Sequence, residues 1–282
     1  MKSIFFVLGL LVALAFSCGT PDKKDTASKK HDKQDTVAGS SEANVLKEYY
    51  SNGKIKTETS AVGNLRQGPT KSYDRQGRIL SEVYYVNNTR EGIATNYYAE
   101  TGKVNSTLVY KNGIKEGDEI WYYESGQAFR VTPYIQARIE GLQKFYFEDG
   151  KLMAEVPYKA GKVGVGLKEY KKDGTLITDY PTIVITKKNY LANANKVILN
   201  IELSDSYAQV KFYRGKLTAG KYLNDDLLLL ATQAGTTQID FNVPPGGGKI
   251  NVNVVITANY KTRYGNPLIL SRNYNVNAVN NN

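Results

Sequence analysis

Glycine recurs through the middle of this chain at an almost constant interval of 24 or 25 residues. The six positions are Gly53, Gly77, Gly102, Gly126, Gly150 and Gly174. A second ladder of nearly the same interval runs out of phase with the first, and its members are Gly68, Gly92, Gly117, Gly141 and Gly164. Two phase-locked ladders indicate a tandem array, and arrays of this period build extended surfaces from stacked copies. About half of the chain is therefore expected to form a repeating surface.

Each repeat has the composition of a β-hairpin. In the copy that begins at Gly117, an aromatic run at residues 120–123 is followed by the turn Glu124-Ser125-Gly126 and a second extended run. Short aromatic and branched strands around a glycine turn are typical of hairpins. The second ladder then predicts the return turns into the next hairpin, at Gln67-Gly68, Glu91-Gly92, Glu116-Gly117 and Glu140-Gly141. A lone hairpin is marginally stable, so we expect the copies to pair edge to edge in a single-layer sheet with open ends.

Three segments share an aromatic run that ends in a glycine turn: Leu46-Lys-Glu-Tyr-Tyr-Ser-Asn-Gly-Lys-Ile55, Trp121-Tyr-Tyr-Glu-Ser-Gly126 and Phe145-Tyr-Phe-Glu-Asp-Gly-Lys-Leu152. Together with the linking pattern Tyr110-Lys-Asn-Gly-Ile-Lys-Glu-Gly117, they resemble the bacterial variant of the MORN repeat, over roughly residues 46–180. The resemblance implies an architecture of meandering hairpins. For function it implies adaptors, scaffolds and appendages to enzymes rather than one activity.

The amino terminus has the pattern of a secretory signal. Lys2 precedes an apolar run at residues 4–16, which ends at Ala15-Phe16-Ser17-Cys18. The run is too short to span a bilayer comfortably. Cys18 is the only cysteine of the chain, and the segment around it resembles a relaxed lipobox. We therefore expect a signal peptide at residues 1–17 and a lipid anchor on Cys18; the alternative is an ordinary signal peptide with an unrelated cysteine.

Residues 18–44 then form the lipidated cysteine and a predicted flexible tether. The segment is rich in lysine, aspartate, serine and threonine and has almost no large apolar residues, so it cannot support a core. Its r.m.s. span is about 28 Å. The expected location is the outer membrane. The membrane face stays open, because Asp22 and Asp25 are interrupted by Lys23 and Lys24 and make no clear acidic sorting cluster.

The repeat rhythm stops after Tyr180-Pro181, which divides a six-repeat array at residues 45–180 from a second domain at residues 181–282. Seven strand-like runs follow, at residues 182–186, 196–203, 208–213, 227–231, 236–243, 250–260 and 268–274. Their alternation of apolar and polar residues is typical of sheets with one buried face. We predict an immunoglobulin-like β-sandwich without a cysteine pair, in an all-β chain. Asn273 to Asn282 is expected to be a frayed strand and tail.

The residues of common catalytic sites are missing from the predicted folded regions. His31, the only histidine, lies in the tether, and Cys18 is assigned to lipid. Ser-His-Asp and Cys-His arrangements and His/Cys metal sites are therefore excluded. A carboxylate pair such as Asp225-Asp226 would need a pocket that a single-layer sheet does not readily provide. The sequence predicts a protein that is not an enzyme, with no metal and no cofactor other than the lipid on Cys18.

Two groups of residues are candidates for binding. The first comprises the aromatic residues Tyr85, Tyr98, Trp121 and Tyr123, whose rings could stack on sugars or hold an extended peptide; the alternative is that such rings supply the apolar stripe of the sheet itself. The second comprises the basic residues Lys211, Arg214, Lys261 and Arg263, in a domain with 11 basic and 5 acidic residues. That surface could face anionic lipid, lipopolysaccharide phosphates or an acidic partner, or it is simply solvated.

These features predict a non-catalytic outer-membrane lipoprotein that acts as an interaction, scaffold or accessory subunit of an envelope complex, such as a β-barrel transport, secretion or assembly machine. Tethering raises the effective concentration of such a subunit, so weak contacts suffice. The alternative is a protein that binds glycan, peptidoglycan or peptide through exposed tyrosines of the array. Nucleic acid is not an expected partner of an exported lipoprotein, and export also argues against an antitoxin-like role.

Overall fold

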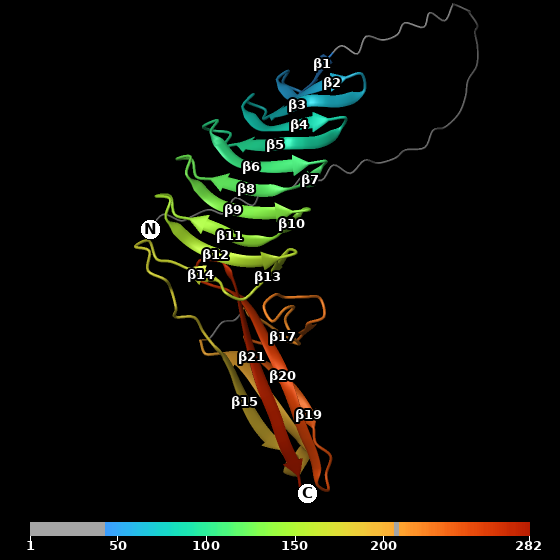
Figure 1. Ribbon diagram of the computed structural model, residues 1–282, viewed down its shortest axis with the longest axis vertical. Helices are drawn as coiled ribbons and strands as arrows, with labels where there is room; N and C mark the ends of the chain where they lie inside the picture. Colours follow the sequence, from blue (N-terminus) through green and yellow to red (C-terminus); the bar gives the residue numbers. More distant parts are fainter. Residues whose placement is uncertain (1–42, 206–208) are drawn as a thin grey trace, which may run out of the picture. The chain divides into compact units, whose positions relative to one another are not determined.

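The computed structural model describes residues 43–205 and 209–282 (Figure 1). Within these ranges the chain forms 21 strands and one short helix, α1 (Leu191–Ala194). The predicted signal peptide, Cys18 and most of the predicted tether lie outside the described residues. The first strand begins at Ala43, so the last two residues of the predicted 18–44 tether belong to the sheet. Within the described residues, no helix has the length and apolar character needed to cross a membrane.

Fourteen strands form one antiparallel sheet in which neighbours in the chain are neighbours in the sheet, with β7, β10 and β14 as short pieces beside β6, β9 and β12 (Figure 1). The expected all-β meander of consecutive hairpins is confirmed. The strands are β1 (Ala43–Tyr49), β2 (Ile55–Val62), β3 (Leu65–Tyr73), β4 (Ile79–Val86), β5 (Thr89–Tyr97), β6 (Val104–Lys111), β7 (Ile114–Lys115), β8 (Gly117–Tyr122), β9 (Ala128–Ile135), β10 (Arg138–Ile139), β11 (Gly141–Tyr146), β12 (Leu152–Lys159), β13 (Lys162–Val163) and β14 (Lys168–Glu169).

The first glycine ladder lies in the turns, as predicted. All six of its members have positive φ, from +67° to +90°. The interpretation of the second ladder is wrong. The return turns lie a few residues earlier, as two-residue turns such as Asn87-Asn88 between β4 and β5. Gly68 instead lies inside β3 with φ +104°, where the register between β2 and β3 shifts as in a β-bulge. A β-carbon at Gly68 would also come within 3.1 Å of the Ser60 β-carbon, so both backbone and space favour glycine there.

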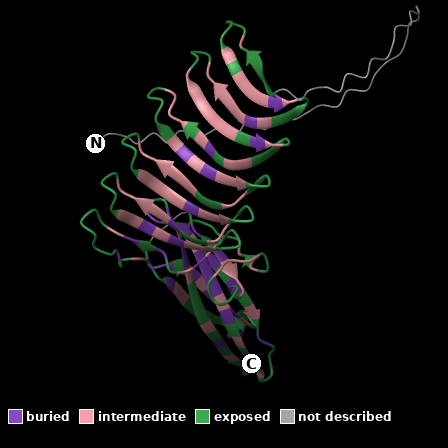
Figure 2. Cartoon of the chain, turned by 45° about the horizontal axis from the view of Figure 1, so that its top comes forward, coloured by how far each residue is buried: buried purple, intermediate pink, exposed green. Residues whose placement is uncertain are grey.

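The two faces of this sheet differ. Directly paired residues point to the same side and successive residues to opposite sides. One side, here called the packed face, carries small or medium side chains that are buried, and these are Ala94, Leu108, Thr132, Gln143 and Val156. Gln143 donates a hydrogen bond from Nε2 to Thr132 Oγ1 at 2.9 Å across this face. The other side, here called the open face, carries the side chains that alternate with these along each strand. Most array positions are half-buried or exposed (Figure 2).

The C-terminal module has one strand in each of the seven predicted runs: β15 (Ile183–Tyr190), β16 (Lys196–Leu203), β17 (Lys211–Arg214), β18 (Leu228–Leu229), β19 (Thr237–Asn242), β20 (Gly248–Lys261) and β21 (Pro267–Asn280). They form a three-stranded sheet, β15-β16-β19, and a four-stranded sheet, β18-β17-β20-β21. The core between them includes Val197, Leu199, Phe212, Ile256 and Val276, and buried positions are concentrated in these strands (Figure 2).

The expectation of a frayed C-terminus is wrong. β21 continues to Asn280, whose side chain is buried. Its Nδ2 donates to the Val243 carbonyl and to Asn195 Oδ1, both at 2.9 Å. These partners satisfy the buried amide, and asparagine is therefore compatible with an ordered last strand.

The end of the array and the C-terminal module share one core. Val156 and Leu167 of the array belong to the same buried cluster as Phe212 and Ile256. At the last array strand, Val165 N–H donates to the Lys221 carbonyl at 2.9 Å, and Leu223 N–H donates to the Val163 carbonyl at 3.1 Å. The C-terminal edge of the array is thus covered, whereas every residue of β1 at the opposite edge is exposed.

Candidate interaction surfaces

Tyrosines beside three of the glycine turns join one repeat to the next. The hydroxyl of Tyr50 donates to the Tyr73 carbonyl at 2.8 Å. Tyr98 donates to the Tyr122 carbonyl at 2.6 Å, and Tyr123 to the Tyr146 carbonyl at 2.9 Å. Tyr98 and Tyr123 were predicted to carry outward rings, but both are half-buried and their hydroxyls are used between repeats. Because the bonds span 23 or 24 residues, nothing local in the sequence distinguishes them from free rings.

Charged residues of the motif serve the same purpose. The lysine after the glycine reaches a carbonyl of the next copy, as in Lys54 Nζ to Gln76 O at 2.6 Å and Lys103 Nζ to Glu124 O at 2.7 Å. At the other end of the strands, the acidic residue before a second-ladder glycine accepts a hydrogen bond from the next return turn. Glu116 Oε2 accepts from Gln136 N–H at 2.9 Å, for example. The period itself is the sequence signal that could have revealed these roles.

Tyr85, another predicted binding residue, is not exposed at the surface either. It is 7% exposed and lies on the packed face, because it pairs with Gly68 and Arg90. The Arg66 guanidinium lies 4.2 Å from its ring centroid, a cation–π contact. The neighbour Tyr84 points to the opposite side and is 44% exposed. Which ring of this adjacent pair points outward depends on the register of the strand.

Trp121 is half-buried on the packed face, where it pairs with the buried Ser106. The Arg130 guanidinium lies 5.0 Å from its ring centroid. The indole Nε1 is buried without a hydrogen-bond partner among the described residues. Its surroundings are those of a packing residue rather than an exposed stacking platform.

The four basic candidates are not brought to one place. Lys211 and Lys261 are exposed on neighbouring strands, and Lys211 pairs with Asn259, two residues before Lys261. Arg263 is exposed in the β20–β21 turn with its guanidinium 5.1 Å from the Tyr264 ring centroid. Arg214 belongs to the four-stranded sheet, and its guanidinium lies 5.5 Å from the ring centroid of Phe241, a residue of the three-stranded sheet. Three of the four cations are therefore exposed, and only Lys211 and Lys261 lie on neighbouring strands.

The open face carries a feature that the sequence argument missed. A row of apolar side chains, here called the apolar row, crosses the array at one level and consists of Val45, Pro69, Tyr84, Ile93, Val109, Pro133, Leu142 and Pro157. Direct pairs in it are Pro69 with Tyr84, Ile93 with Val109, and Leu142 with Pro157. Four members are strongly exposed: Val45 at 55%, Tyr84 at 44%, Ile93 at 60% and Leu142 at 44%.

A groove of about 340 Å³ lies at the β1–β3 end of this face, lined by Val45, Lys47, Glu58, Ser60, Pro69 and Lys71. Lys47 Nζ lies 3.0 Å from Glu58 Oε1, and Tyr73 donates from its hydroxyl to Glu58 Oε2 at 2.7 Å. Burial, and then this hydrogen bond, raise the pKa of Tyr73 to about 12. The hydrogen bonds from Tyr73 and Lys47 lower the pKa of Glu58. The groove thus combines apolar side chains with fixed charges of both signs.

Among the described residues, no group of three or more His, Cys, Asp and Glu side chains is placed to hold a metal ion. The family model of the MORN repeat variant matches four segments of the chain, residues 44–60, 66–87, 115–135 and 139–160. No curated protein matches the chain. The matched segments lie within the fourteen-stranded sheet and match four of its hairpins to the MORN repeat variant. Such repeats are generally associated with protein and membrane binding.

Proposed function

We propose that this MORN-repeat chain is a non-catalytic interaction subunit that binds a protein partner in the bacterial envelope through the open face of its array. The apolar row is the observation that carries the proposal. Exposed apolar residues scattered singly need no explanation, but a row of them along one face is typical of an interaction surface. The row is interrupted at two strands, by Ser60 on β2 and by Asp118, which pairs with Pro133, on β8. In residues 43–205, tyrosines, lysines and glutamates of the motif bond neighbouring repeats, whereas four members of the row are strongly exposed.

The chemistry of the face suggests how a partner is held. Strands lie about 4.8 Å apart, so the ten strands from β1 to β12 that the row crosses present a ridge on the order of 45 Å long. Apolar contacts along the ridge would provide affinity, since each square ångström of buried apolar area contributes about 25 cal/mol. The charged groove at β1–β3 would set orientation, because electrostatic complementarity governs specificity more than affinity.

A pair of substitutions tests this surface. Ile93→Asp places a charge in the middle of the apolar row, and Val104→Asp places one at an exposed position of the packed face, two residues from the buried Ser106. Partners are recovered from gently solubilised membranes with each tagged variant and with the wild type. A stoichiometric partner that is retained by Val104→Asp and lost from Ile93→Asp, with equal melting temperatures, supports the proposal. A partner recovered equally with both variants, or a wild type that is recovered alone, refutes it.

We further propose that the chain is anchored to the outer membrane through lipid on Cys18 and ends in an immunoglobulin-like domain. The anchor rests on the sequence around Cys18, and the domain on the strand order of its two sheets, with the first, second and fifth strands in one and the fourth, third, sixth and seventh in the other. Metabolic labelling with an alkyne fatty acid tests the anchor. The label should appear on the wild type and be absent from Cys18→Ser; label on both, or on neither, contradicts the assignment.

A further inference from the structure

The outer surface of the β20–β21 hairpin is lined by asparagine. Val254, Ile256 and Val276 point into the core and are buried. The alternate residues point outward, and five of them are exposed asparagines, Asn251, Asn253, Asn273, Asn275 and Asn277. Asn251 pairs with Asn277 and Asn253 with Asn275, so the amides stand side by side across the two strands.

Asparagine is depleted in strands, where branched and aromatic residues are preferred. None of these five side chains has a hydrogen-bond partner within the part of the chain that the structure describes, so they do not serve the fold as Asn280 does. Residues that break a local rule without a structural return are expected at functional sites. The asparagine surface is therefore a candidate binding surface.

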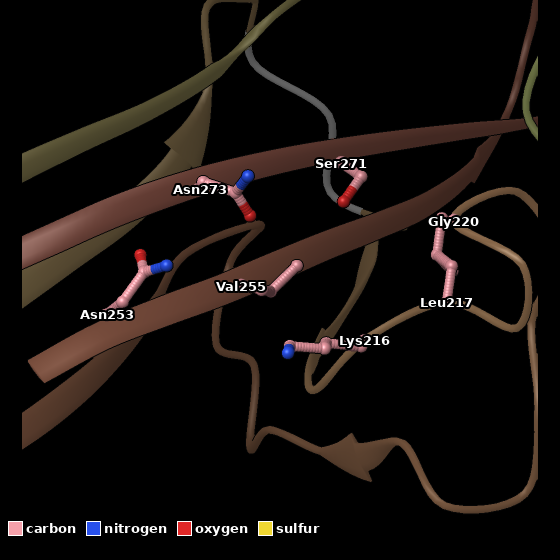
Figure 3. A pocket seen from close by; sticks show the side chains of 7 residues that line it. All are labelled: Lys216, Leu217, Gly220, Asn253, Val255, Ser271 and Asn273. Atoms are coloured by element: carbon pink, nitrogen blue, oxygen red, sulfur yellow. The ribbon is translucent and has the colours of Figure 1, made fainter.

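A groove of about 430 Å³ crosses this surface (Figure 3). Its floor consists of Asn253 and Val255 from β20 and Ser271 and Asn273 from β21, and its wall of Lys216, Leu217 and Gly220 from the loop after β17. The outward residues Thr257 and Ile269 are buried, so the floor is covered at that end of the hairpin. It is accessible at Val255 and Asn253, toward the opposite end. A volume of this size suits a small ligand or a short segment of a longer one.

The lining specifies the chemistry of the ligand. An amide side chain donates and accepts hydrogen bonds, and so does a hydroxyl. Lys216 is the only charged residue of the lining, and its ammonium has no ion-pair partner among the described residues. Leu217 and Val255 are the only large apolar members of the lining. A peptide recognised by its side chains would need apolar pockets, whereas a sugar chain needs paired donors and acceptors.

We propose that this groove, here called the amide groove, binds a segment of an acidic polysaccharide. The amides of Asn253 and Asn273 and the hydroxyl of Ser271 bond sugar hydroxyls, and the Lys216 ammonium pairs with a sugar carboxylate. The site is separate from the apolar row and goes beyond the protein-binding role proposed above.

Isothermal titration of the full chain in detergent tests the proposal, with hexagalacturonate as the acidic probe and maltohexaose as the neutral one. Hexagalacturonate should bind saturably, and maltohexaose more weakly. Asn253→Ala and Asn273→Ala should each weaken hexagalacturonate binding by about 5–10-fold, the effect of one hydrogen bond. Lys216→Gln should weaken it by about 10-fold and reduce its salt dependence. Asn251→Ala and Lys249→Gln, on the same face outside the groove, are matched controls that should leave binding unchanged.

Three results would overturn the proposal. If hexagalacturonate does not bind at millimolar concentration, an acidic sugar chain is excluded as the ligand. Equal weakening by the groove variants and their matched controls moves the binding elsewhere on the surface. Poly-L-glutamate that binds as tightly as hexagalacturonate shows attraction of charge, or of an acidic peptide, instead of sugar recognition. The substituted side chains are exposed, so variants that fold as judged by circular dichroism are expected.

Discussion

Removal of the Glu169 carboxyl group should weaken the joint between the array and the C-terminal module. Glu169 lies in β14 and is 1% exposed. Oε1 accepts hydrogen bonds from Thr262 Oγ1 at 2.6 Å and from Asn266 Nδ2 at 2.7 Å, both in the β20–β21 turn. Oε2 accepts from the Tyr180 hydroxyl at 3.1 Å, in the segment that connects the two parts. One side chain thus holds three groups that are distant in sequence.

The magnitude follows from the donors that Glu169→Ala leaves behind. Thr262 and Asn266 are buried, and each buried donor without a partner costs about 1–3 kcal/mol. Tyr180 is half-buried and adds about 1 kcal/mol. The expected loss is on the order of 5 kcal/mol, which lowers the melting temperature of a unit of this size by roughly 10–20 °C. Glu169→Gln keeps an oxygen for Thr262 and Asn266 and should cost only about 1 kcal/mol.

Differential scanning calorimetry of the full chain measures this, with fluorescence of the single tryptophan, Trp121, as a separate report on the array. Glu202→Ala is the control, because Glu202 is exposed on β16. Equal melting temperatures for the Glu169→Ala and Glu202→Ala proteins would refute the reasoning. So would a Glu169→Gln protein whose melting temperature falls as far as that of Glu169→Ala.

Four further predictions concern the array. Glu140→Ala removes the acceptor of the Ala160 N–H at 2.6 Å and should lower the free energy of unfolding in urea by about 1 kcal/mol. Ala137→Gly should raise it by about 0.5–1 kcal/mol, because Ala137 has φ +62° in a return turn; an unchanged urea midpoint would contradict this. Tyr123→Phe should lower the melting temperature while Tyr84→Phe leaves it unchanged, since only Tyr123 bonds the next repeat. Tyr73 ionises near pH 10 when unfolded and about 12 when folded, so its stabilisation is complete below pH 10 and is lost as the pH rises from 10 to 12. Urea midpoints across that range should fall less for Tyr73→Phe than for the wild type.

Local sequence patterns were sufficient to predict the hairpins of the array and the seven C-terminal strands in their order. Positive-φ glycines at a fixed period and the alternation of apolar and polar residues are local signals, and they placed the glycine turns and a strand in each of the seven C-terminal runs. They failed at the second glycine ladder, because a bulge glycine such as Gly68 and a turn glycine have the same local signature. The short turn Gln136-Ala137 contains neither glycine nor asparagine and had no signal to find.

Which side chains are available for binding depends on how the strands pair. Whether Tyr84 or Tyr85 faces solvent depends on register, since a shift of one residue reverses every side chain of a strand. Whether Tyr98 and Tyr123 are free depends on carbonyls 23 or 24 residues away, and the amide groove depends on a loop that lies beside two other strands. The apolar row and the asparagine surface exist because residues far apart in the chain are brought to one level of a sheet. Local patterns specify a strand, whereas the faces of a sheet are set by pairing between strands.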